Sequence, residues 1–167
     1  MPRGEGYRFL ILGQRLERAL ISARVISVWH RRLGGFGSQA AFAEWVKLLK
    51  SVSAYEAYLR SFRATMQGEL VLTFLLQSAD LPRSVFGSLV LVESLLAGLG
   101  PQDPSPLRRK AGRLRSSVEF VEAGVLGPNL GAFLETLEEG IVDLADEVER
   151  TYFRPATANA MHAYEAF

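Results

Sequence analysis

The sequence has no cysteine, two histidines and no apolar run long enough to cross a membrane. Without cysteine the chain can form no disulfide, no thiolate nucleophile and no thiolate metal site, and this composition suits a reducing cytoplasm. The longest apolar segment, residues 85–99, is interrupted by Ser88, Glu93 and Ser94, and residues 1–9 lack the progression of a signal peptide. We therefore expect a soluble, cytoplasmic protein that contacts no membrane.

The residue patterns of common catalytic and cofactor sites are also missing. His30 and His162 belong to no H-E-x-x-H or Glu-x-x-His arrangement, which argues against a zinc hydrolase or a di-iron site. The glycine-rich stretches 4–6 and 34–37 are not followed by Lys-Ser or Lys-Thr, so neither predicts a phosphate-binding loop. No serine lies in a nucleophile elbow. The sequence therefore predicts no metal, no cofactor and no catalytic residue, and it favours a protein that is not an enzyme.

Charge of neither sign is in excess, because 19 basic residues face 18 acidic ones. A net charge of +1 predicts attraction to neither nucleic acid nor a membrane surface. Within the chain the charges are segregated, with basic residues concentrated in 108–115 and acidic residues in 135–149. We expect these segments to pair as antiparallel helices, with Arg115 near Glu138 and Arg108 near Asp146. A phosphate-binding surface on the basic segment is the alternative.

What the sequence has in abundance is helical periodicity, and 49% of its residues are hydrophobic. Apolar residues recur at steps of three and four in residues 6–29 and in six later segments, while no segment alternates convincingly between apolar and polar residues. This pattern predicts an all-α fold, an antiparallel helical bundle of about six to seven helices with no sheet. One domain would span residues 1–155, and residues 156–167 would form a tail that is either frayed or docked through Tyr164 and Phe167.

Short-range signals predict where several of these helices begin and end. The predicted boundaries are Gly34 and Gly35 as the end of the first helix, Ser38 as the cap of the second, and Ser53 to Glu56 as a capping box that starts the third. Further along, Asp80-Leu81-Pro82 would open the fifth helix, and the last helix would run from Leu130 to about Phe153.

Glu17 and Arg18 lie at the centre of the first predicted helix. Helical partners are three or four residues away, and at those distances neither residue meets an opposite charge. If buried, each would therefore need a partner from elsewhere in the fold or from a ligand. We interpret the pair as an ion-pair or hydrogen-bond clamp between helices; the alternatives are a site for a ligand or partner protein, and plain exposure to solvent. Gly6 and Gly13 share a side with Glu17, where another backbone could come close.

Five groups of residues along 3–153 are informative when taken together. They are Arg3 to Leu10 (RGEGYRFL), Gly13 to Ala19 (GQRLERA) with Ser22-Ala23-Arg24, Ser53 to Tyr58 (SAYEAY), Phe74 to Leu76 with Leu81 to Val85 (LPRSV), and Glu149 to Phe153 (ERTYF). In their residues and their order along the chain they resemble the alpha-E family of bacterial all-helical domains. Members of that family generally have about twice this length and two Glu-Arg helices, and the chain resembles their second half. Leu20 and Ile21 stand where the family usually has an acidic and a polar residue.

The resemblance implies partners more than a reaction. Alpha-E domains resemble accessory modules found beside or fused to circularly permuted ATP-grasp amide ligases, with transglutaminase-like or proteasome-like hydrolases in the same systems. The charged positions within the matching motifs are the candidate ligand- or partner-binding residues, namely Glu17, Arg18, Arg8, Glu56 and Arg83.

Three functional hypotheses follow for this chain. The first is a non-catalytic accessory module of an ATP-grasp peptide ligase system, which docks the ligase or presents its substrate. The second is a small-ligand-binding or enzymatic domain in which Glu17 and nearby arginines converge on a polar pocket. The third is a homo-oligomeric structural module, such as a homodimer, in which a second copy takes the place of the missing half.

Overall fold

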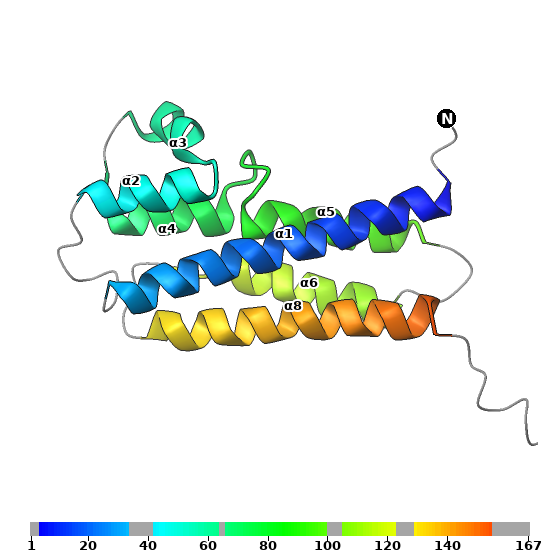
Figure 1. Ribbon diagram of the computed structural model, residues 1–167. Coiled ribbons are helices and arrows are strands. Elements are labelled where there is room, and N and C mark those ends of the chain that lie inside the picture. Colours follow the sequence, from blue (N-terminus) through cyan, green and yellow to red (C-terminus); the bar gives the residue numbers. More distant parts are fainter. Residues whose placement is uncertain (1–3, 34–41, 64–65, 100–104, 123–128, 155–167) are drawn as a thin grey trace, which may run out of the picture.

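The computed structural model describes residues 4–33, 42–63, 66–99, 105–122 and 129–154 (Figure 1). Within these ranges the chain forms seven helices and no strand, so the predicted all-α fold is confirmed. The helices are α1 (Glu5–Arg32), α2 (Phe42–Ser51), α3 (Tyr55–Phe62), α4 (Gly68–Gln77), α5 (Val85–Ala97), α6 (Ser105–Glu119) and α8 (Leu130–Tyr152). None of these helices carries an apolar stretch that could span a membrane.

Four helices form the bundle that carries the rest of the fold. α1 packs against both α5 and α8, and α6 packs against the same two helices on the other side. Neighbouring helices in this ring run in opposite directions, which confirms the predicted antiparallel arrangement (Figure 1). The three shorter helices α2, α3 and α4 lie beside the C-terminal half of α1 at one end of the bundle.

The core consists of the apolar stripes that the helical periodicity predicts. On α8 the stripe is fully buried, and each large aliphatic side chain taken out of water contributes about 1.5–3 kcal/mol. The buried stripe of α8 is Leu130, Leu134, Leu137, Ile141, Leu144 and Val148, and that of α1 includes Leu12, Leu16, Ala19, Ala23 and Ile26. On α1 the stripe covers one side only, because α1 has neighbours among the described helices on that side.

Two clusters of aromatic side chains lie at opposite ends of the described structure. Under α3, the buried ring of Tyr58 stacks on Phe62 with ring centroids 4.8 Å apart, and Phe74 meets it edge-on at 5.5 Å. At the opposite end Phe9 of α1 packs edge-on against Tyr152 at 5.0 Å and against Phe153 at 4.9 Å. This second cluster joins the start of α1 to the end of α8.

One predicted helix start and one predicted helix cap are wrong. The fifth helix, α5, does not open at Asp80-Leu81-Pro82 but at Val85, because the buried Ser84 caps it by accepting a hydrogen bond from the backbone N–H of Gly87 at 2.9 Å. The capping box at Ser53 is absent as well. Ser53 has a φ of 55°, in the left-handed region, and α3 starts after Ala54 with no side-chain cap. Gly34, Gly35 and Ser38, as well as the tail from 155 onward, lie outside the described residues.

The charged faces of α6 and α8 meet as predicted, but through different residues. Lys110 approaches Asp143 at 3.6 Å and Glu147 at 2.9 Å. Lys110 lies as far before Arg115 as Asp143 lies after Glu138, so the antiparallel register is the expected one. The predicted pairs of Arg115 with Glu138 and of Arg108 with Asp146 are not formed, because a helix turns through about 100° per residue and Arg115 therefore points away from α8.

Arg115 and Glu138 instead link other helices. Arg115 donates from Nε to Glu93 of α5 at 2.8 Å, and this hydrogen bond raises the pKa of its guanidinium. Glu138 accepts a hydrogen bond from the buried Ser27 of α1, and its carboxylate lies 3.7 Å from the guanidinium of Arg24. The two residues therefore connect α6 to α5 and α8 to α1 rather than α6 to α8.

Candidate functional site: a groove and a pocket beside α1

An open groove with a volume of about 490 Å³ lies between α1 and α8. We call it the α1–α8 groove. Its wall on α1 comes from residues spaced at helical steps, and so does its wall on α8. The apolar lining consists of Phe9, Leu12, Leu16 and Leu20 from α1 and of Ile141, Val142, Ala145 and Val148 from α8, with Phe153 just beyond that helix.

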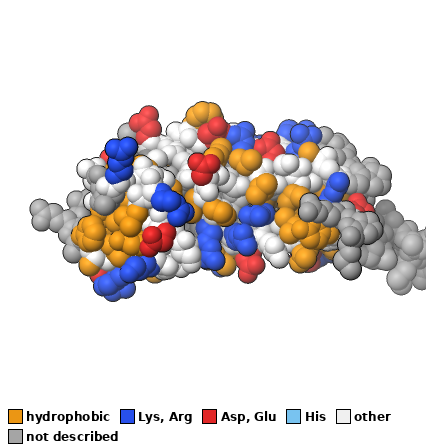
Figure 2. Space-filling model, turned by 90° about the horizontal axis from the view of Figure 1, so that it is seen from above, with side chains coloured by type: hydrophobic (Ala, Val, Ile, Leu, Met, Phe, Trp, Pro, Cys, Tyr) orange, Lys and Arg blue, Asp and Glu red, His pale blue; other side chains and the backbone are white. Residues whose placement is uncertain are grey.

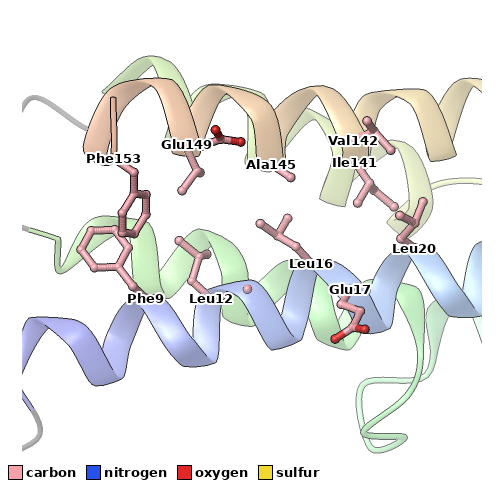
Figure 3. A pocket seen from close by; sticks show the side chains of 12 residues that line it. Phe9, Leu12, Leu16, Glu17, Leu20, Ile141, Val142, Ala145, Glu149 and Phe153 are labelled. Carbon is pink, nitrogen blue, oxygen red and sulfur yellow. The ribbon is translucent and has the colours of Figure 1, made fainter. Parts of the chain in front are cut away.

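Figure 3 shows how these side chains lie. Phe9 and Phe153 stand together at one end of the α1–α8 groove, while Leu16 and Ala145 point toward each other from the two helices near its middle. Gly13 also lines the groove, and no described atom lies within 4 Å of the place where a side chain at Gly13 would begin. The groove is therefore open along the middle of α1 rather than filled from within.

Carboxylates flank the apolar lining. Glu17 and Glu149 both line the α1–α8 groove, one from each helix, and both are exposed. The outer edge of α8 continues this acidic character along a stripe at steps of three and four residues. This exposed stripe comprises Glu135, Glu139, Val142, Asp146 and Glu149. Arg154 lies 3.2 Å from Glu149, but both side chains are more than half exposed, so solvent weakens this pair.

A second, more polar pocket of about 360 Å³ lies on the other side of Glu17, where α1 meets the end of α2 and the connection between α4 and α5. We call it the polar pocket. Its charged lining is Glu17, Arg18 and Arg83, and Gln14, Ser22 and Ser51 add polar groups. Figure 2 shows the face that carries α2 and α3, and basic side chains gather near the middle of that face, between hydrophobic patches toward its two ends.

Of the five candidate residues, three come together and two do not. Glu17, Arg18 and Arg83 share the polar pocket although 65 residues separate Arg18 from Arg83. Arg8 lies near the start of α1, where its guanidinium donates a hydrogen bond to the carbonyl of Gly98. Glu56 is exposed on α3 and lines neither the α1–α8 groove nor the polar pocket. No three histidine, aspartate or glutamate side chains in the described ranges are grouped so that they could hold a metal ion.

The interpretation of Glu17 and Arg18 as a clamp between helices is wrong for the described part of the chain. Both side chains are exposed, and neither forms an ion pair or a hydrogen bond with a described residue. The reason is that α1 has described neighbours on one side only, so the two charges remain in water and need no partner. The close backbone approach expected at Gly6 and Gly13 is not found either, since nothing described lies within 4 Å of either position.

Sequence reasoning missed the α1–α8 groove altogether. Several of its lining residues belong to the periodic stripes that predict a buried core, namely Phe9, Leu12, Leu16, Ile141 and Val148. The sequence carried no signal that separates the groove from the core, because the exposure of these side chains is a property of the packed structure. Among the lining residues, Phe153 is 59% exposed and Val142 37%. Only the packing of α1 on α8 shows that these residues border an open surface.

One comparison with known proteins identifies the chain. A family described as a predicted alpha-helical domain with a conserved ER motif matches residues 1–153. No curated protein and no solved structure was found to match. In one-letter code ER is Glu-Arg, and this dipeptide occurs at Glu17-Arg18 and again at Glu149-Arg150. The glutamates of both dipeptides line the α1–α8 groove from opposite sides.

Proposed function

Because the chain belongs to the Alpha-E family, we propose that it is a non-catalytic interaction module of an ATP-grasp peptide ligase system. In this proposal the chain docks a circularly permuted ATP-grasp ligase through the α1–α8 groove. The ligase as partner is taken from the resemblance of the sequence motifs to the family. The observation that supports docking at this place is an open apolar groove bordered by the glutamates of both Glu-Arg dipeptides.

The groove fits one kind of partner element, an amphipathic helix. Two antiparallel helices with an open channel between them can accept a third helix along the channel, as in helix-in-groove recognition. The groove lining is almost entirely apolar, and burying such a surface is the main driving force of association. We expect the docked helix of the ligase to place aliphatic or aromatic side chains over Leu16 and Ala145.

The charges around the groove determine which sign of charge the docked helix should carry on the side that faces α8. The outer edge of α8 carries four exposed carboxylates, at Glu135, Glu139, Asp146 and Glu149. A basic flank on the partner helix would complement this edge, whereas an acidic flank would be repelled. The proposal therefore commits to a helix of the ligase with an apolar face and with lysine or arginine along the side that faces α8.

The test is a titration of the purified chain with the circularly permuted ATP-grasp ligase of the same organism. Val142→Asp places a charge in the apolar lining of the groove, and we expect it to weaken binding at least about ten-fold, which corresponds to 1.4 kcal/mol. The matched control is Val90→Asp, because Val90 of α5 is also 37% exposed and does not line the groove. We expect the control to bind like the wild type.

The result also has to show the predicted charge dependence. Glu149→Lys replaces one negative charge at the edge of α8 by a positive charge. We therefore expect slower association with the ligase and a smaller effect of salt on the association rate. The proposal is wrong if the wild-type chain does not bind the ligase, or if Val142→Asp and Val90→Asp bind equally well.

A further inference from the structure

The polar pocket has a different chemistry from the α1–α8 groove. Its charged side chains are two arginines and one glutamate, and its apolar lining is aliphatic. The aliphatic part consists of Ile21, Val25 and Val52. A volume of about 360 Å³ lies within the range of small-molecule sites and is too small for a folded partner.

The backbone around the pocket is held in place by buried serines. Ser22 of α1 is buried and donates a hydrogen bond to the carbonyl of Arg83 at 2.7 Å. The next residue, Ser84, is fully buried and caps α5. The connection between α4 and α5 is thus fixed to α1 at Arg83, which lines the pocket, so the fold brings Arg18 and Arg83 to one site.

The three charged side chains of the pocket are not paired with other side chains in the described part of the molecule. The side chains of Glu17, Arg18 and Arg83 are exposed, and none of these side chains forms an ion pair or a hydrogen bond with a described residue. By contrast, Lys110 and Arg115 each meet carboxylates of a neighbouring helix. The charges that stabilise the bundle are therefore paired, and the charges that line the polar pocket are available to a ligand.

We propose that the polar pocket binds a free α-amino acid with an aliphatic side chain. Two guanidinium groups present planar pairs of donors that match a carboxylate, so Arg18 and Arg83 hold the carboxylate of the ligand. Glu17 accepts hydrogen bonds from the ammonium group of the ligand. The aliphatic side chain of the ligand then packs on Ile21, Val25 and Val52. A zwitterion satisfies all three charges at once, whereas inorganic phosphate leaves Glu17 facing a like charge.

The probe is L-leucine, titrated by calorimetry into the full chain and compared with 4-methylpentanoate, which has the same carboxylate and side chain but no ammonium group. We expect leucine to bind and 4-methylpentanoate to bind at least about ten-fold more weakly. Inorganic phosphate is the third probe, and we expect it to bind more weakly than leucine. The inference is overturned if the wild type does not bind leucine, or if phosphate binds as tightly.

Two variants separate the roles of the charges. Arg83→Gln should weaken leucine binding at least about ten-fold, while Arg60→Gln, an exposed arginine of α3 outside the pocket, should not. Glu17→Gln should weaken leucine binding without weakening that of 4-methylpentanoate. Circular dichroism confirms that each variant is folded. Unchanged leucine binding by Arg83→Gln would refute the inference, and since Arg83 does not line the α1–α8 groove, this outcome is independent of ligase docking.

Discussion

Replacing Ser84 by alanine should destabilise the whole bundle, although the substitution removes only one oxygen atom. The hydroxyl of Ser84 has two roles. It accepts from the N–H of Gly87 at the start of α5, and it donates to the carbonyl of Ser78 at the end of α4. Ser84 itself is fully buried, so water has no access with which to replace either hydrogen bond.

The magnitude follows from these two hydrogen bonds. Loss of a serine cap costs about 1 kcal/mol, and loss of a neutral hydrogen bond to a carbonyl costs about 0.5–1.5 kcal/mol. The free energy of unfolding should therefore fall by about 2 kcal/mol. For a domain of this size, each 1 kcal/mol lowers Tm by about 2–4 °C, which predicts a decrease of about 4–8 °C.

The assay is urea-induced unfolding followed by circular dichroism, with thermal unfolding as the second measurement. Ser117→Ala is the control, because the hydroxyl of Ser117 also donates to a backbone carbonyl, that of Leu114 at 2.8 Å, but on the exposed side of α6. The control should stay within about 0.5 kcal/mol of the wild type. If Ser84→Ala unfolds at the same urea concentration as the wild type, Ser84 is not the cap of α5 and the structure of this connection is wrong.

Three further predictions concern packing and ionisation. Gly68→Ala should destabilise the chain by about 1–3 kcal/mol in urea unfolding, because the new Cβ would lie 2.5 Å from the buried ring of Trp45. Leu134→Ala, in the buried stripe of α8, should cost about 2–5 kcal/mol in the same assay, and a loss below about 1 kcal/mol would contradict its burial. Burial raises the pKa of Tyr58 above 10.0, so folding stability is complete below that pH and declines above it as the unfolded chain ionises. Tyr58→Phe should therefore lose less stability than the wild type between about pH 9 and 11, and equal losses would refute this assignment.

The buried faces of the helices could be predicted from the sequence because periodicity is a local property. The steps of three and four residues along α8 place Leu134, Ile141 and Val148 on one side, whatever the rest of the fold does, and these residues are buried. The limits of α8 were also close to those predicted. For the same reason the charged faces of α6 and α8 could be expected to meet.

Helix starts were harder to predict because a cap depends on backbone angles that the sequence does not state. Ser53 has the right spacing to Glu56 but a left-handed backbone, whereas Ser84 has no glutamate three residues later and still caps α5.

The candidate site could be predicted only in part. The motifs pointed to Glu17, Arg18 and Arg83, but whether they are buried or exposed depends on which side of α1 is covered. That is a property of tertiary packing, and the α1–α8 groove depends on it in the same way.

Binding of the circularly permuted ATP-grasp ligase to Gly13→Leu tests the docking groove most directly. A leucine at Gly13 fills the middle of the α1–α8 groove without introducing charge, and it favours the helix by roughly 1 kcal/mol, so the chain should remain folded. Gly6→Leu is the matched control, since Gly6 lies on the same helix with equally open surroundings but outside the groove. We predict that Gly13→Leu loses ligase binding and that Gly6→Leu retains it. Equal affinity of the two variants for the ligase would show that the groove is not where the partner docks.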